Sequence, residues 1–176
     1  LTGAIARSLA VEREANFIEE TFIAGLLHDM GRIVLSQKLP AEFEKVLLVK
    51  EKAGISQLAA EQSVLKLTHG EIGGWLARKW NLPMPFVEVM HNHHTPLDIL
   101  AQDPPAQKDT ANLVFMIHAS DALSKGLVEG KPQLASVARI DPKVAAELKI
   151  GPEAWDRFQQ RTEDEISKAR AFLELL

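Results

Sequence analysis

The chain has 176 residues, of which 46% are hydrophobic and 25% are charged, and its net charge is −4. These values are ordinary for a globular protein, and the acidic balance argues against a nucleic-acid partner. The absence of cysteine excludes disulfides and thiolate metal sites and fits a cytoplasmic location, and no apolar stretch approaches the roughly 20 residues of a membrane span.

Apolar residues recur at helical spacing along almost the whole chain, which predicts an all-α fold. The expected helices cover residues 2–13, 16–37, 40–53, 56–67, 69–80, 84–94, 109–128, 141–149 and 152–174. Asp141 is expected to cap a helix, and Gly54 and Gly126 are expected to end two others. The segment 98–109, DILAQDPPAQKD, is expected to be a loop between helices. Because the chain opens in mid-pattern and without Met, we expect its true N-terminus to lie upstream.

The stretch GLLHDMGR, residues 25–32, places His28 and Asp29 next to each other inside the expected helix 16–37. Side chains one residue apart on a helix diverge by about 100°, so the pair is expected to face two metal positions rather than to chelate one ion. Burying such a pair is costly unless partners satisfy both groups, and a cation can do so. The pattern therefore predicts a polar, cation-binding centre on an apolar helix.

His69 follows Thr68, which has the chemistry of a helix cap. Gly70, Gly73 and Gly74 surround it, and each costs about 1 kcal/mol relative to alanine inside a helix. A close approach by another helix would explain these glycines. The alternative for His69 is a helix-start residue that faces water.

The segment VMHNHHTP, residues 89–96, brings His91, His93 and His94 to the end of an expected helix. Imidazole suits zinc, iron, copper and nickel, and a site that adds carboxylate also admits manganese. The alternative is a structural role, because positive side chains at a helix C-terminus interact favourably with its dipole.

Asp121 lies in the apolar helical stretch VFMIHASDAL, residues 114–123. His118 precedes it by three residues and is expected on the same helix face. A buried aspartate needs a cation or several hydrogen-bond donors. The alternative is that Asp121 only accepts hydrogen bonds from a neighbouring histidine.

An HD pair, a distant histidine, a paired HH and a later aspartate together resemble the HD superfamily of metal-dependent phosphohydrolases, and most closely its HDOD branch (HD-related output domain). The resemblance covers residues 1–128 and is carried by FIAGLLHDMGRIVL (22–35), THGEIGGWLARKWNLP (68–83), VMHNHH (89–94) and SDAL (120–123). Its most specific element is the motif H-x-x-x-G-x-x-L-x-x-x-W-x-L-P, which begins at His69 and ends at Pro83.

This resemblance implies a helical bundle whose metal ligands project into a central cleft. The residues that match the ligands of the related HD-GYP branch are His28, Asp29, His69, His93, His94 and Asp121, and they imply a centre of up to two divalent ions (Fe, Mn or Zn). Arg32 stands where that branch has lysine. In an enzyme, Asp29 would bridge the metals and Arg32 would bind a phosphate, whereas the alternative for Arg32 is a surface salt bridge. TPLDIL follows His94 in place of a GYP motif, so cyclic-dinucleotide cleavage is not expected.

The resemblance implies a regulatory output module of bacterial signal transduction with a retained metal-binding cleft, whose partner would be a signalling protein or an upstream sensor domain. The alternative is an active metal-dependent phosphohydrolase, a phosphodiesterase or phosphomonoesterase, that acts on a phosphate-containing small molecule through two metals. A third interpretation is a metal-free helical scaffold. Residues 129–176 are expected to form a helical extension on the same domain, and at least one of Trp75 and Trp80 is expected in the core.

Overall fold

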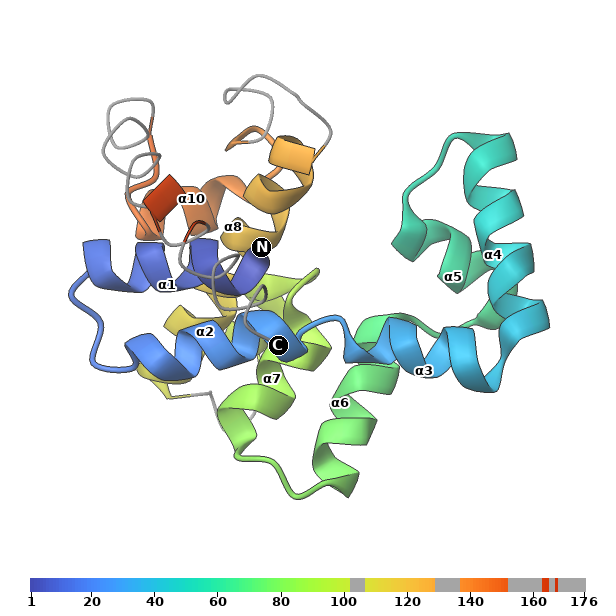
Figure 1. Cartoon of the computed structure of the whole chain (residues 1–176), viewed down its shortest axis with the longest axis horizontal. Coiled ribbons are helices and arrows are strands. Elements are labelled where there is room, and N and C mark those ends of the chain that lie inside the picture. Colours follow the sequence, from blue (N-terminus) through green and yellow to red (C-terminus); the bar gives the residue numbers. More distant parts are fainter. Residues whose placement is uncertain (102–106, 129–136, 152–162, 165–166, 168–176) are drawn as a thin grey trace. The chain divides into compact units, whose positions relative to one another are not determined.

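The computed structural model describes residues 1–101, 107–128, 137–151, 163–164 and 167 (Figure 1). Its helices are α1 (Thr2–Glu12), α2 (Ile18–Leu27), α3 (Met30–Lys38), α4 (Pro40–Ala53), α5 (Gln57–Leu65), α6 (His69–Lys79), α7 (Met84–Asn92), the 3-10 helix η1 (Pro96–Ala101), α8 (Lys108–Val128) and α10 (Pro142–Glu147). These described ranges contain no strand, which confirms the predicted all-α fold. Among the helices of this part of the chain, none is both long and apolar enough to cross a membrane.

The chain divides into two compact units. The first comprises Leu1–Leu26 and Thr95–Leu176, and the second comprises Leu27–His94. Helices α1, α2, η1, α8 and α10 belong to the first unit, and helices α3 to α7 belong to the second. The histidines and the aspartate that the sequence singles out between residues 28 and 94 therefore all lie in the second unit.

In the first unit, α8 packs against α1, η1 and α10. Most of the 21 residues of α8 are buried, so α8 is a central helix with buried residues on several faces rather than an amphipathic surface helix. The hydroxyl groups of Thr2 and Ser124 form a hydrogen bond of 3.0 Å between α1 and α8. Helices α1 and α2 approach closely, because a Cβ on Gly25 would lie 2.6 Å from the Cα of Gly3.

In the second unit, α4 and α5 form a helical hairpin, and α6 packs against both α7 and α3 (Figure 1). The small core between α6 and α7 buries Ala77, Val87 and Met90, with Leu27, Met30 and Leu82 packed against it. The glycines of α6 allow this packing. A Cβ on Gly70 would lie 2.9 Å from the carbonyl oxygen of His91, and one on Gly74 would lie 2.9 Å from the His91 side chain. The close helix approach predicted from these glycines is therefore confirmed.

Three predicted helix boundaries are confirmed by their local chemistry. Thr68 caps α6 in a capping box, because its side chain accepts from the backbone N–H of Glu71 while the Glu71 carboxylate accepts from the backbone N–H of Thr68. Gly54 ends α4 in the left-handed conformation with φ of 61°. The Asp141 side chain accepts the backbone N–H groups of residues 143 and 144 at the start of α10.

The prediction of one continuous helix over 16–37 is wrong. The structure has two helices, α2 and α3, and His28 and Asp29 form the turn between them. No proline marks this break. It coincides instead with a tertiary contact, since a Cβ on Gly31 in the first turn of α3 would lie only 1.9 Å from the carbonyl oxygen of His69. Close packing of α3 on α6 thus replaces the continuous helix that the local pattern favours.

The expectation that at least one of the two tryptophans lies in the core is also wrong, because Trp75 and Trp80 are 54% and 51% exposed. The buried face of α6 carries the small residues Gly73 and Ala77, and Trp75 projects from the opposite side of the helix. Gly126 does not end its helix, because it is buried within α8, which continues to Val128.

Part of the segment expected as a loop is helical, since η1 covers its first residues, up to Ala101, and α8 begins at Lys108. The expected helix 152–174 lies outside the described residues except at positions 163–164 and 167. The division into a domain of residues 1–128 and an extension of residues 129–176 stays a prediction.

Candidate metal centre

Four side chains in the second unit converge on one point. Asp29, His69, His93 and His94 each offer one ligand atom, and these atoms lie within 4.8 Å of one another. Asp29 comes from the turn before α3, His69 from the first residue of α6, and the two remaining histidines from the end of α7. Packing of α6 against α3 and α7 brings these chain segments together. We call this group the four-residue centre.

Asp29 is the anionic member of the four-residue centre. Its Oδ1 lies 3.2 Å from His69 Nε2 and 3.7 Å from His93 Nε2. Its Oδ2 accepts a hydrogen bond of 3.0 Å from the Arg32 guanidinium. Burial works to raise the pKa of Asp29, but the hydrogen bond from His69, the neighbouring ring of His93 and the nearby charge of His28 and His69 outweigh burial and hold this pKa far below its usual range. Asp29 is therefore a carboxylate at neutral pH.

His69 is buried and is held through both ring nitrogens. Its Nδ1 lies 2.7 Å from Glu61 Oε2, and its Nε2 lies 2.9 Å from His94 Nε2. The backbone N–H of His69 also donates to Glu61 Oε2, at 2.8 Å. Burial works to lower the pKa of His69, but the hydrogen bonds and charges of Asp29 and Glu61 raise it above 6.5.

His93 is completely buried, and its ring is oriented by the backbone of α7. Its Nδ1 lies 3.2 Å from the carbonyl oxygens of both Val89 and Met90. Because carbonyl oxygens only accept, Nδ1 carries the proton and Nε2 faces Asp29 with its lone pair. Burial, together with the charges of His28 and His69, lowers the pKa of His93 below 6.5 against the opposing effect of Asp29. Its neutral form is the one that can ligate a metal.

His28 lies beside the four-residue centre but is not one of its members. Its ring is buried and makes an edge-on contact with the ring of His93, with the centroids 5.1 Å apart. Its Nε2 lies 3.7 Å from Asp29 Oδ2. His28 thus approaches the second oxygen of Asp29, whereas His69 approaches the first.

Arg32 and Asp121, the other predicted site residues, have charged partners of their own. Arg32 pairs with Asp29 at 3.0 Å, and its side chain is 38% exposed, so the salt bridge of the alternative is formed, with a member of the four-residue centre as its partner. Asp121 lies in the first unit on α8, where its carboxylate accepts a hydrogen bond from Lys125 one turn later. His118, from the same helix, accepts the backbone N–H of Asp141 through Nε2.

Glu61 is the functional candidate that sequence reasoning missed. It lies on α5 with no exposed surface, and its two oxygens accept hydrogen bonds from His69 and Gln57. Burial works to raise the pKa of Glu61, but these hydrogen bonds and the charge of His69 lower it. The available signal was a charged residue within the largely apolar stretch LAAEQSVL, which is the signal that singled out Asp121.

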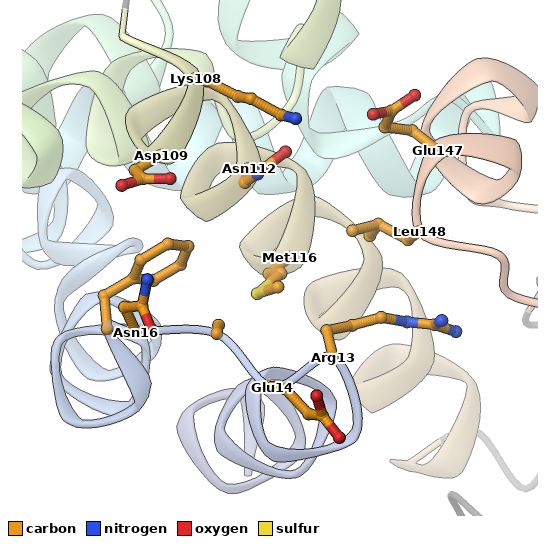
Figure 2. A pocket seen from close by; sticks show the side chains of 11 residues that line it. Arg13, Glu14, Asn16, Lys108, Asp109, Asn112, Met116, Glu147 and Leu148 are labelled. Atoms are coloured by element: carbon orange, nitrogen blue, oxygen red, sulfur yellow. The ribbon is translucent and has the colours of Figure 1, made fainter.

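A cavity of about 340 Å³ lies in the first unit, between the α1–α2 connection, α8 and α10 (Figure 2). Met116 lines it, together with Lys108 and Asp109 from the start of α8, Arg13 before α2 and Glu147 from α10. Figure 2 shows Lys108 extending toward Glu147. The charges around this cavity are mixed, and no member of the four-residue centre lines it.

The model of the HDOD domain family matches residues 1–96. The chain belongs to the HDOD domain family. The matched segment of this HDOD chain contains the whole four-residue centre and Glu61, whereas Asp121 lies beyond it.

The chain is also similar to two known proteins. An uncharacterized protein of Treponema pallidum (strain Nichols) is 31% identical over 94 residues, which are 53% of this HDOD chain and 18% of that protein. A solved HDOD domain protein of unknown function from Geobacter sulfurreducens matches with a TM-score of 0.62 and 21% identity, over 93% of this chain and 59% of that one. The chain thus spans less than a fifth of the first protein and under two thirds of the second, and it shares the fold of the second.

Proposed function

We propose that this HDOD domain is a regulatory output module of a bacterial signalling protein and that it binds one divalent metal ion at the four-residue centre. The observation that carries the proposal is the convergence of one carboxylate and three imidazoles within 4.8 Å. Polar and charged groups removed from water need compensating partners, and a bound cation would supply one to all four side chains. A cytoplasmic location and a signalling partner or sensor domain are part of the same proposal.

The donor set fits a borderline transition metal. Three imidazole nitrogens and one carboxylate oxygen suit Zn²⁺, Fe²⁺ or Mn²⁺ better than Ca²⁺ or Mg²⁺, which prefer oxygen ligands. Asp29, His69, His93 and His94 would hold the ion. A metal bound there supplies Lewis acidity and lowers the pKa of a coordinated water. His93 contributes a neutral imidazole already oriented by backbone carbonyls.

One ion, rather than two, is proposed because the carboxylate oxygens that a second ion would need already have cationic partners. Arg32 donates to the Oδ2 of Asp29, the oxygen that a bridging carboxylate would offer to a second metal. Asp121 pairs with Lys125. A cationic guanidinium next to Oδ2 opposes a second cation there by charge repulsion.

A regulatory role is favoured over hydrolysis by these same contacts, because one ion with an engaged arginine is a weaker phosphate-cleaving arrangement than a two-metal clamp. The phosphohydrolase alternative keeps one observation in its favour. Asp29 and His94 retain some exposed surface, which the approach of a phosphate-containing small molecule would require.

The test is metal content per chain, measured by elemental analysis on protein purified without chelator or a histidine tag, followed by equilibrium dialysis against Zn²⁺ and Mn²⁺. We expect one equivalent, and no release of phosphate from phosphomonoester or phosphodiester substrates by the loaded protein. Two equivalents with metal-dependent turnover would establish the phosphohydrolase. No binding by a protein with a native helical circular-dichroism spectrum would leave the scaffold interpretation.

A further inference from the structure

We infer that Glu61 is a positioning residue of the metal centre, which fixes the His69 ring so that its Nε2 is available to the ion. The inference rests on the proposed function and extends it to a residue on α5 that is not itself one of the four ligands. Nδ1 and Nε2 of one imidazole point in opposite directions, so the partner of one nitrogen decides what the other can bind. In this chain the partner of Nδ1 is Glu61.

The contacts of Glu61 leave little freedom for either side chain. Oε2 lies 2.7 Å from His69 Nδ1 and accepts the backbone N–H of the same residue at 2.8 Å. Oε1 accepts the side-chain amide of Gln57 at 3.0 Å. The Glu61 carboxylate therefore accepts hydrogen bonds from both the ring and the backbone of His69, the first residue of α6.

Burial of Glu61 and His69 makes their desolvation costly, so both side chains need hydrogen-bond partners. Glu61 has no exposed surface and His69 is 2% exposed, and a buried carboxylate is retained only where hydrogen bonds and charge offset its desolvation. Because an ionised carboxylate accepts and never donates, His69 Nδ1 must be the donor. The lone pair or proton of Nε2 then faces Asp29 Oδ1 at 3.2 Å, within the four-residue centre.

Charge gives Glu61 a second effect on the ion. A carboxylate on the far nitrogen increases the electron density that an imidazole donates to a metal, and losing such a partner typically weakens metal affinity about 10- to 100-fold. Glu61 also adds a negative charge behind His69, on the side away from Asp29, which partly balances the added cation. A glutamine could keep the hydrogen bond but would lose the charge.

The experiment compares Co²⁺ binding to the wild type, Glu61→Gln and Glu61→Met by titration of the visible absorption bands of bound cobalt. We expect affinity to fall in the order wild type, Gln, Met, with about a 10-fold loss for Gln and up to about 100-fold for Met, and with shifted bands in both variants. The matched control is Glu88→Gln, which removes another buried carboxylate of the same unit, bonded to Asn92 at 2.7 Å. Its cobalt affinity should equal that of the wild type.

A second readout separates this inference from the proposed function. Imidazole ¹⁵N chemical shifts of metal-free protein at alkaline pH should show His69 protonated at Nδ1 in the wild type, and a mixture of both tautomers in Glu61→Met. If the wild type binds no cobalt, the proposed function fails, and the ¹⁵N shifts still decide whether Glu61 fixes the ring. If the wild type binds cobalt and both Glu61 variants bind it equally well, or if His69 carries its proton on Nε2, the inference is overturned.

Discussion

The α-carbon of Gly31 lies so close to the backbone of His69 that a Cβ there would sit 1.9 Å from the His69 carbonyl oxygen. This contact joins the first turn of α3 to the first turn of α6, and Asp29 and His69 are carried on either side of it. The distance of 3.2 Å between Asp29 Oδ1 and His69 Nε2 therefore depends on a residue without a side chain at position 31.

Gly31→Ala should destabilise the protein by about 1–3 kcal/mol, because the added methyl meets backbone atoms that cannot rotate away. It should also weaken metal binding by displacing α3 from α6. Urea unfolding and zinc titration measure the two effects. Gly151→Ala is the matched control, because a Cβ at that position meets nothing within 4 Å. Equal stability of Gly31→Ala and Gly151→Ala would contradict the close contact.

Replacing both His28 and Asp29 by alanine should abolish metal binding while the helical circular-dichroism signal remains. In the single variants, the loss of metal binding should come from the change at Asp29, because Asp29 belongs to the four-residue centre and His28 does not. We expect Asp29→Asn to lose most of the zinc affinity and His28→Ala to keep one equivalent. Loss of zinc from His28→Ala alone would place His28 among the ligands.

Metal affinity should rise with pH. The pKa of His69 is raised from its ordinary value, so this imidazole keeps its second proton to higher pH than a free histidine does, and that proton must leave when the ion binds. In the metal-free protein, the stability from that raised pKa is fully present below pH 6.5 and is lost as the pH rises through the folded-state pKa. Calorimetric zinc titrations in buffers of different ionisation enthalpy should show proton release that declines toward alkaline pH. A pH-independent affinity would contradict the charged state of His69.

Arg32→Met should lower stability by no more than about 1 kcal/mol, since the Arg32 side chain is 38% exposed and such pairs are weak. Removing the guanidinium also frees Asp29 Oδ2, so the variant tests whether Arg32 opposes a second ion. We expect wild type to bind one manganese and Arg32→Met to bind a second one weakly. If inorganic phosphate binds metal-loaded wild type but not Arg32→Met, Arg32 is a phosphate ligand, as the phosphohydrolase alternative requires.

Asp121→Asn should leave metal content at one equivalent, because Asp121 pairs with Lys125 and is not a member of the four-residue centre. Stability should change little, since Lys125 is 41% exposed and its pairing is screened by solvent. Elemental analysis of wild type and variant side by side is the measurement. A fall from two equivalents to one would show that Asp121 holds a second ion.

The sequence by itself determined the helical class, most helix boundaries and the metal-capable residue types. Helical periodicity and caps are local properties, so Thr68, Asp141 and Gly54 act as predicted. The histidines between positions 69 and 94 were recognisable as a set because their spacing matched a known family.

Only the tertiary structure decided which of these residues meet. The break at His28 and Asp29 has no local signal, because it follows from the packing of α3 on α6 at Gly31. Trp75 is exposed because glycines and alanine occupy the buried face of its helix. Glu61 is the clearest example of a residue whose role the sequence does not show. Whether a glutamate in a helix is solvated or buried against a histidine eight residues later depends on how two helices pack, and packing is a property of the whole unit rather than of any short stretch.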